Sequence, residues 1–215
     1  ASSPVLKQHL FILENMTQDF VHLRMHTEFS IKDGMLNPKK VVHKAIASGM
    51  KALAITDATA MFGDVIFYKA ASAAGIKPIL GADCSITNHY NRDDYLRLLF
   101  LARNHQGYLT LCDLLSRAWL TNQYKDRGEV DLDWITPEMA DGLIVLSGFN
   151  TGAIGKAILN GSLSAAEQEA RRLSQKFPHF FMELQRVGRP NDEMLVAESV
   201  KLAKKLGLPV VATQP

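Results

Sequence analysis

The chain has 215 residues, of which 47% are hydrophobic and 21% are charged, a composition that suits one globular domain with a substantial core. Its formal net charge of +2 is too balanced for a strong electrostatic nucleic-acid footprint. No apolar run approaches the roughly 20 residues that a membrane helix needs, so no membrane partner is expected. Cys84 and Cys112 lie in apolar surroundings, and we expect free buried thiols in a reducing, cytoplasmic compartment.

The N-terminal residues 1–15 are treated separately from the rest of the chain. Their short apolar run is too short for the core of a signal peptide. Met16 resembles a natural start that leads directly into the first strand. We therefore expect residues 1–15 to be an N-terminal extension or an expression remnant, with a short native helix as the alternative, and residues 16–215 to form one domain.

Strands and helices alternate along the domain. Asn37 followed by proline predicts a helix start, and Gly49 predicts its end. Asn104 predicts a cap of a later helix, while Ser164 and Glu167 form a capping box. The predicted strands cover residues 20–25, 52–56, 79–83, 96–102, 143–146, 180–184 and 209–213. The predicted helices cover residues 37–49, 64–74, 104–120, 152–159 and 192–206, with further helical turns opening at 136 and 164 and a polar excursion at 121–134.

This alternation predicts the fold class. Short aliphatic and β-branched strands separated mostly by helices are typical of a parallel sheet covered on both faces. Seven such strands in sequence favour a closed sheet over an open one. We therefore predict an α/β fold of the TIM type, a distorted seven-stranded parallel (β/α)7 barrel. The chain stops directly after the seventh strand, which suggests a fragment of a longer protein.

Polar residues follow one strand after another. Arg24 and His26 follow the first strand, Asp57 ends the second and Asp83 ends the third. In a barrel of alternating strands and helices, the carboxyl ends of the strands converge on one face, and that face normally holds the chemistry. The sequence therefore places a candidate active site there.

Several of these segments together resemble a known family. They are residues 22–30 (HLRMHTEFS) with 33–34 (DG), 54–57 (AITD) with 61–63 (MFG), 75–83 (GIKPILGAD) and 146–148 (LSG). The set resembles the polymerase-and-histidinol-phosphatase (PHP) domain at the start of bacterial DNA polymerase III alpha subunits, over residues 16–213. The resemblance also implies a seven-stranded α/β barrel.

Metal-binding members of that family hold divalent metals at the strand ends with histidines, acids and a cysteine, for phosphoester hydrolysis. This chain departs from that pattern at many of the ligand positions. Residues that cannot serve as ligands stand where the family has histidine or cysteine: Arg24, Ala58, Arg97, Phe149 and Val187. Asp83 replaces a glutamate, and Gln214 and Pro215 replace an Asn-Asp pair. The resemblance therefore implies a degenerate metal site.

The ligands that remain are His26, Asp57, Asp83 and Asp33, and they face two arginines that would repel a dication. We expect no catalytic residue and no bound metal; if a metal binds, its ligands are His26, Asp57 and Asp83. Our hypothesis is that Arg24 and Arg97 take the place of the metal charge by pairing with these acids. Glu183 could face the top of the barrel, but the alternation of side chains along its strand does not decide which face of the sheet it lies on.

What the resemblance implies for function concerns a larger protein. The parent chain would be a DNA-directed DNA polymerase that uses Mg²⁺ in a palm domain absent here and makes most of the DNA contacts. In this fragment we expect no cofactor, and a non-catalytic scaffold that contacts the rest of the alpha subunit and docks the proofreading exonuclease subunit.

Two alternatives from other functional classes stay open, so the sequence leaves undecided whether the fragment is an enzyme. The first is an active metal-dependent phosphoesterase or 3'–5' proofreading nuclease that uses the ligands named above. The second is a free-standing phosphatase of the histidinol-phosphate type. His22 is expected to be structural, whereas His43, His89, His105 and His179 are expected to be solvated.

Overall fold

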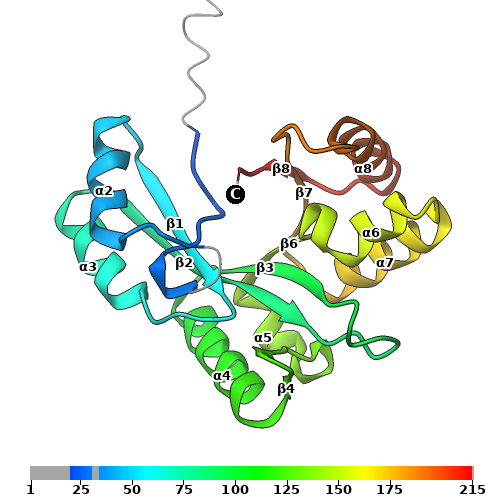
Figure 1. Cartoon of the computed structure of the whole chain (residues 1–215), viewed down its shortest axis with the longest axis horizontal. Helices are drawn as coiled ribbons and strands as arrows, with labels where there is room; N and C mark the ends of the chain where they lie inside the picture. The colour runs from blue at the N-terminus through cyan, green and yellow to red at the C-terminus, as the bar shows by residue number, and fades with distance from the viewer. Residues whose placement is uncertain (1–19, 31–33, 215) are drawn as a thin grey trace, which may run out of the picture.

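The computed structural model describes residues 20–30 and 34–214, in which a curled sheet forms part of a barrel wall (Figure 1). Six strands pair in the order β1-β2-β3-β6-β7-β8. These strands are β1 (Ala52–Ala58), β2 (Lys77–Ile86), β3 (Leu96–Ala102), β6 (Leu143–Leu146), β7 (Phe180–Leu184) and β8 (Val210–Ala212). A small separate hairpin consists of β4 (Gln123–Tyr124) and β5 (Arg127–Gly128).

Helices cover the outer, convex side of this sheet (Figure 1). They are α2 (Pro38–Ala47), α3 (Asp64–Ala73), α4 (His105–Thr121), α5 (Pro137–Asp141), α6 (Ala153–Leu159), α7 (Leu163–Lys176) and α8 (Asp192–Leu206). Three short 3-10 turns are η1 (Glu28–Ser30), η2 (Leu132–Trp134) and η3 (Phe149–Thr151). Among the described residues, none of the helices has the length and apolar character required to span a membrane.

The α/β class is confirmed, but the expected all-parallel, seven-stranded barrel is wrong. β1 pairs with β2 in parallel, and β6, β7 and β8 are parallel to one another. β3, however, is antiparallel to both β2 and β6. The connection of residues 87–95 between β2 and β3 explains this, because a parallel crossover needs a dozen or more residues.

The first predicted strand, residues 20–25, is extended but is not a regular strand. The amides of Ala54 and Thr56 in β1 donate to the carbonyls of His22 and Met25, each at 2.9 Å. The two carbonyls are three residues apart in the segment, whereas the two amides are two residues apart in β1, so the segment holds one extra residue. An extra residue of this kind interrupts a regular β-ladder. The chain therefore reaches the strand ends beside β1 without adding a strand to the sheet.

The helix ends follow their sequence signals with one exception. The Asn37 side chain accepts from the amides of the first turn of α2, and Asn104 accepts from Gly107 N at 2.9 Å. The capping box predicted at Ser164 and Glu167 is wrong, because α7 already begins at residue 163. Its first turn continues directly from the turn after α6.

Three apolar clusters pack on the sheet, of which one lies between β1 and the helices α2 and α3 and includes Ile55 and Phe67. The larger core lies between the convex face and α4 to α8, and includes Phe100 and Phe177. A smaller cluster lines the concave face, with Ala54, Leu99, Leu101 and Leu146 fully or almost fully buried. Polar side chains at the strand ends continue from this concave cluster, and they form the candidate site.

Candidate functional site at the strand ends

Arg24 is the centre of a buried ionic cluster at the strand ends. Its side chain is only 5% exposed. Nε and Nη2 donate to Glu183 Oε1 at 2.8 Å and Oε2 at 3.0 Å, and Nη1 donates to Asp83 Oδ2. Although burial opposes its charge, Asp83 and Glu183 raise the pKa of the guanidinium above its usual value. Arg24 therefore joins the end of β2 to the end of β7 with a fixed positive charge.

Three side chains contact a single carboxylate oxygen of Asp83. Besides Arg24, its Oδ2 is 3.0 Å from His26 Nε2 and 3.2 Å from Arg97 Nη1. Burial alone would raise the pKa of this carboxyl, but Arg24, the hydrogen bond with His26 and Arg97 outweigh it and hold the pKa at about 2. Because an ionised carboxylate only accepts, His26 Nε2 carries the proton of that hydrogen bond.

Arg97 reaches Asp83 because β3 is antiparallel. Ser85 of β2 is paired with Arg97 of β3, so the beginning of β3 lies at the same edge as the end of β2. The Arg97 side chain is 18% exposed, and its Nε is buried without a hydrogen-bond partner among the described residues. Of the acids expected to pair with Arg24 and Arg97 that lie within the described residues, Asp83 is the one that contacts both arginines.

Glu183 is the acid whose direction the sequence left undecided. It is fully buried, and besides Arg24 its carboxylate accepts from Gly148 N at 3.0 Å, Gln185 Nε2 at 3.1 Å and Thr213 Oγ1 at 2.5 Å. All these partners are donors, so the Glu183 carboxylate has a full set of hydrogen bonds. It ties β7 to the loop after β6 and to the end of β8.

Asp57 belongs to a separate network. Its oxygens accept from Thr27 N at 2.6 Å, Thr27 Oγ1 at 2.8 Å and Ser30 Oγ at 2.7 Å. The expectation that Asp57 pairs with an arginine is wrong, because among the described residues its partners are neutral donors. Their hydrogen bonds satisfy the fully buried carboxylate and fasten η1 to the end of β1.

The other positions named from the sequence do not take part in the hydrogen bonds of the ionic cluster. Phe149 is 2% exposed and belongs to the core under the helices. Val187 is 38% exposed, and Ala58 is half-buried opposite Asp83 in the β1–β2 register. Asp33 lies outside the described residues, as do residues 1–15.

A cavity of about 840 Å³ opens over the cluster. Arg24, His26, Asp83 and Arg97 line one part of it, and Lys44, Arg189 and the half-buried His22 line the remainder together with apolar side chains of α2. Basic residues outnumber acidic ones in this lining. The cavity therefore favours anions, whereas the same place in a metal-binding member would attract cations.

The donor set does not fit a metal centre. A catalytic metal needs several convergent ligands and an open position. Asp83 Oδ2 and both Glu183 oxygens are bonded to Arg24, and the Asp57 oxygens are bonded to Thr27 and Ser30. Within the described residues, Asp83 Oδ1 is the acidic oxygen of this cluster that lacks a partner. A lone carboxylate oxygen beside two guanidiniums does not make a site for a dication.

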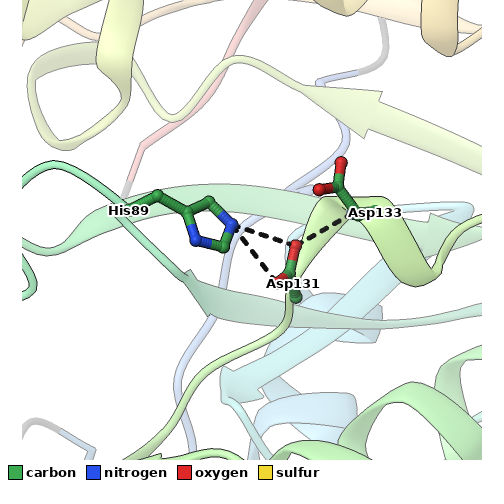
Figure 2. A group of neighbouring side chains, drawn as sticks. All are labelled: His89, Asp131 and Asp133. Carbon is green, nitrogen blue, oxygen red and sulfur yellow. Dashed lines mark hydrogen bonds and ion pairs between the residues drawn. The ribbon is translucent and has the colours of Figure 1, made fainter.

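A separate group of possible ligands lies near the β2–β3 connection (Figure 2). One ligand atom each from His89, Asp131 and Asp133 lies within 4.8 Å of the others. The His89 side chain is 61% exposed and Asp131 is 18% exposed, with 3.2 Å between them. Asp131 also caps η2 by accepting from Asp133 N at 3.0 Å. Spacing did not indicate this group, because His89 is far from both acids in sequence.

Comparisons with known proteins agree with this architecture. The family model described as "PHP domain" matches residues 22–187. The DNA polymerase III subunit alpha of Neisseria meningitidis serogroup B is 46% identical over 202 residues, and that of Escherichia coli K12 is 42% identical over 195. The alignments cover 91% and 90% of this chain. The chain spans 17% of the length of each of these relatives.

Solved structures support the fold. A putative metal-dependent phosphoesterase from Bifidobacterium adolescentis superposes with a TM-score of 0.58 and 13% identity, and an amidohydrolase from Chromobacterium violaceum with 0.63 and 14%. Each superposition covers 90% of this chain and 86% of the other. The chain therefore belongs to the PHP domain family and is similar to the corresponding part of bacterial DNA polymerase III alpha subunits.

Proposed function

We propose that this domain is a non-catalytic scaffold within a DNA polymerase III alpha subunit of the cytoplasm, and that it docks the proofreading exonuclease subunit. The observation that carries the proposal is the buried Arg24 guanidinium between Asp83 and Glu183. It supplies a positive charge at the strand ends without an open coordination position. The cluster thus joins β2 to β7 through Arg24, whose donors occupy one oxygen of Asp83 and both oxygens of Glu183.

The polymerase reaction itself belongs to the parent chain in this proposal. Nucleotide addition with Mg²⁺ and most DNA contacts would be made by domains outside these residues. The domain's net charge of +2 agrees with a minor part in DNA binding. Loss of hydrolysis here fits a division of labour in which a separate subunit removes misincorporated nucleotides, and that is why we assign the exonuclease as the partner.

The docking proposal is tested with the purified proofreading exonuclease subunit and the 215-residue chain. Calorimetric titration should show saturable binding with one exonuclease per chain. The variant Arg24→Met, checked for folding by circular dichroism, should bind with the affinity of the parent chain, because the cluster is internal. Absence of binding to the parent chain would contradict the docking role.

The catalytic alternative is tested by hydrolysis of bis(p-nitrophenyl) phosphate with Mn²⁺ or Zn²⁺. We expect no rate above buffer for the parent chain, and none for Asp83→Asn. A metal-dependent rate that Asp83→Asn abolishes would support the phosphoesterase or nuclease reading, with His26, Asp57 and Asp83 as its centre.

A further inference from the structure

A second groove lies on the helix-covered side of the sheet, away from the strand-end cluster. It has a volume of about 450 Å³ and is lined by residues of α3, of β2 and of the beginning of α4. Figure 1 shows where these elements lie. Pro78 and Leu80 of β2 form part of its apolar wall, and Val65 at its rim is 55% exposed. Its polar lining includes one side chain with an unusual environment, Asp64.

Asp64, the first residue of α3, is 1% exposed, and neither of its carboxylate oxygens has a hydrogen-bond partner among the described residues. Buried polar groups are normally paired, so an orphaned carboxyl that lines a groove marks a place for a missing donor. Lys69 also lines the groove but does not fill this role. It follows Asp64 by five positions, so the two side chains leave the helix on different faces.

Two tyrosines complete the lining. Tyr68 of α3 is 52% exposed, and Tyr108 of α4 lines the groove beside it. Burial and Cys112 raise the pKa of the Tyr108 hydroxyl, with a smaller contribution from Asp64. Aromatic rings and a carboxylate are the groups that bind an ammonium or guanidinium group. Asn104 and the exposed His105 are the other polar residues of the lining.

We infer that this groove binds a peptide segment of a partner protein that inserts a lysine or arginine side chain toward Asp64, between Tyr68 and Tyr108. The basic group supplies the donor that the orphaned carboxyl lacks. Because burial and Asp57 raise the pKa of Asp64 to about 8, the carboxyl releases its proton when the cation binds. The exposed apolar rim around Val65 and Tyr68 contacts the flanking residues of the peptide, which a free amine could not provide. The inference concerns a surface separate from the strand-end cluster and does not depend on the exonuclease as partner.

The test uses the acetylated, amidated peptide Ala-Leu-Lys-Leu-Ala and the ¹⁵N-labelled 215-residue chain. Saturable amide shifts should centre on Val65, Tyr68 and Tyr108. Asp64→Asn should weaken binding about tenfold or more, the scale expected for one charge-assisted hydrogen bond. Asp113→Asn, which removes an exposed carboxylate on α4, should bind like the parent chain.

Four results would overturn the inference. They are equal binding of the same peptide with norleucine in place of lysine, equally tight binding of n-butylamine, an unchanged affinity of Asp64→Asn, and no saturable shift up to about 5 mM peptide. The amide spectrum of each variant establishes that it is folded, so a loss of binding is separated from a loss of structure.

Discussion

Replacing Arg24 with methionine removes the centre of the ionic cluster while keeping an unbranched, flexible side chain. Three Arg24 nitrogens donate to two carboxylates that are fully buried. Removing one partner of a buried ion pair typically costs about 3–5 kcal/mol. Glu183 keeps three other donors, and Asp83 keeps His26 and Arg97. We therefore expect a loss of about 3 kcal/mol in the free energy of unfolding.

Urea unfolding followed by circular dichroism measures this loss. With a slope of about 2 kcal/mol per molar urea, the midpoint should fall by about 1.5 M. Arg186→Met is the matched control, because Arg186 and Glu193 form an ion pair at 2.7 Å whose side chains are 68% and 72% exposed. Its cost should stay below about 1 kcal/mol. If Arg24→Met unfolds within about 1 kcal/mol of the parent chain, the cluster does not stabilise the fold as argued.

Three further predictions follow from the same structure. Asp83 has its pKa held at about 2 in the folded state, whereas an unfolded aspartate titrates near pH 4. Its contribution to stability is therefore complete above about pH 4 and is lost as the pH falls toward 2, and urea unfolding of Asp83→Asn should lack that part of the acid dependence. Burial and the nearby Asp57 raise the pKa of Asp64 to about 8, so the folded state retains a proton that the unfolded chain releases near pH 4. Stability should fall as the pH rises from 4 to 8, and Asp64→Asn should raise the melting temperature more at pH 8 than at pH 5; an equal effect at both would refute this. Gly107→Ala should cost several kcal/mol, because its Cβ would lie 1.8 Å from the Gly142 carbonyl oxygen; a melting temperature like the parent's would contradict that contact.

The sequence predicted most element positions, because the local signals are strong. Asn37 and Asn104 cap their helices as their residue types indicate. The direction of β3 was missed because the predicted strand ended at residue 83, which left the twelve residues 84–95 before the next strand, enough for a parallel crossover. In the structure β2 continues to Ile86, so only residues 87–95 form the connection.

The site was predicted in part. Arg24 and Asp83 were placed together from their positions at strand ends, whereas Arg97 was placed beside them only by the family resemblance, since it begins its strand and reaches that edge because β3 is antiparallel. Glu183 was left open because Phe180, Phe181 and Met182 are all apolar, so alternation could not tell the concave face from the convex one. The orphaned Asp64 is a tertiary property, since its burial depends on how α3 packs against β1 and β2.

The most direct test of the central claim is metal content at the strand ends. The chain, in a His89→Ala background that removes the exposed group of Figure 2, is purified without chelator, supplied with Mn²⁺ and Zn²⁺, dialysed and measured by mass spectrometry. The account predicts metal far below one equivalent, because guanidiniums hold the acids. Near-stoichiometric metal that survives dialysis and disappears in Asp83→Asn would contradict it.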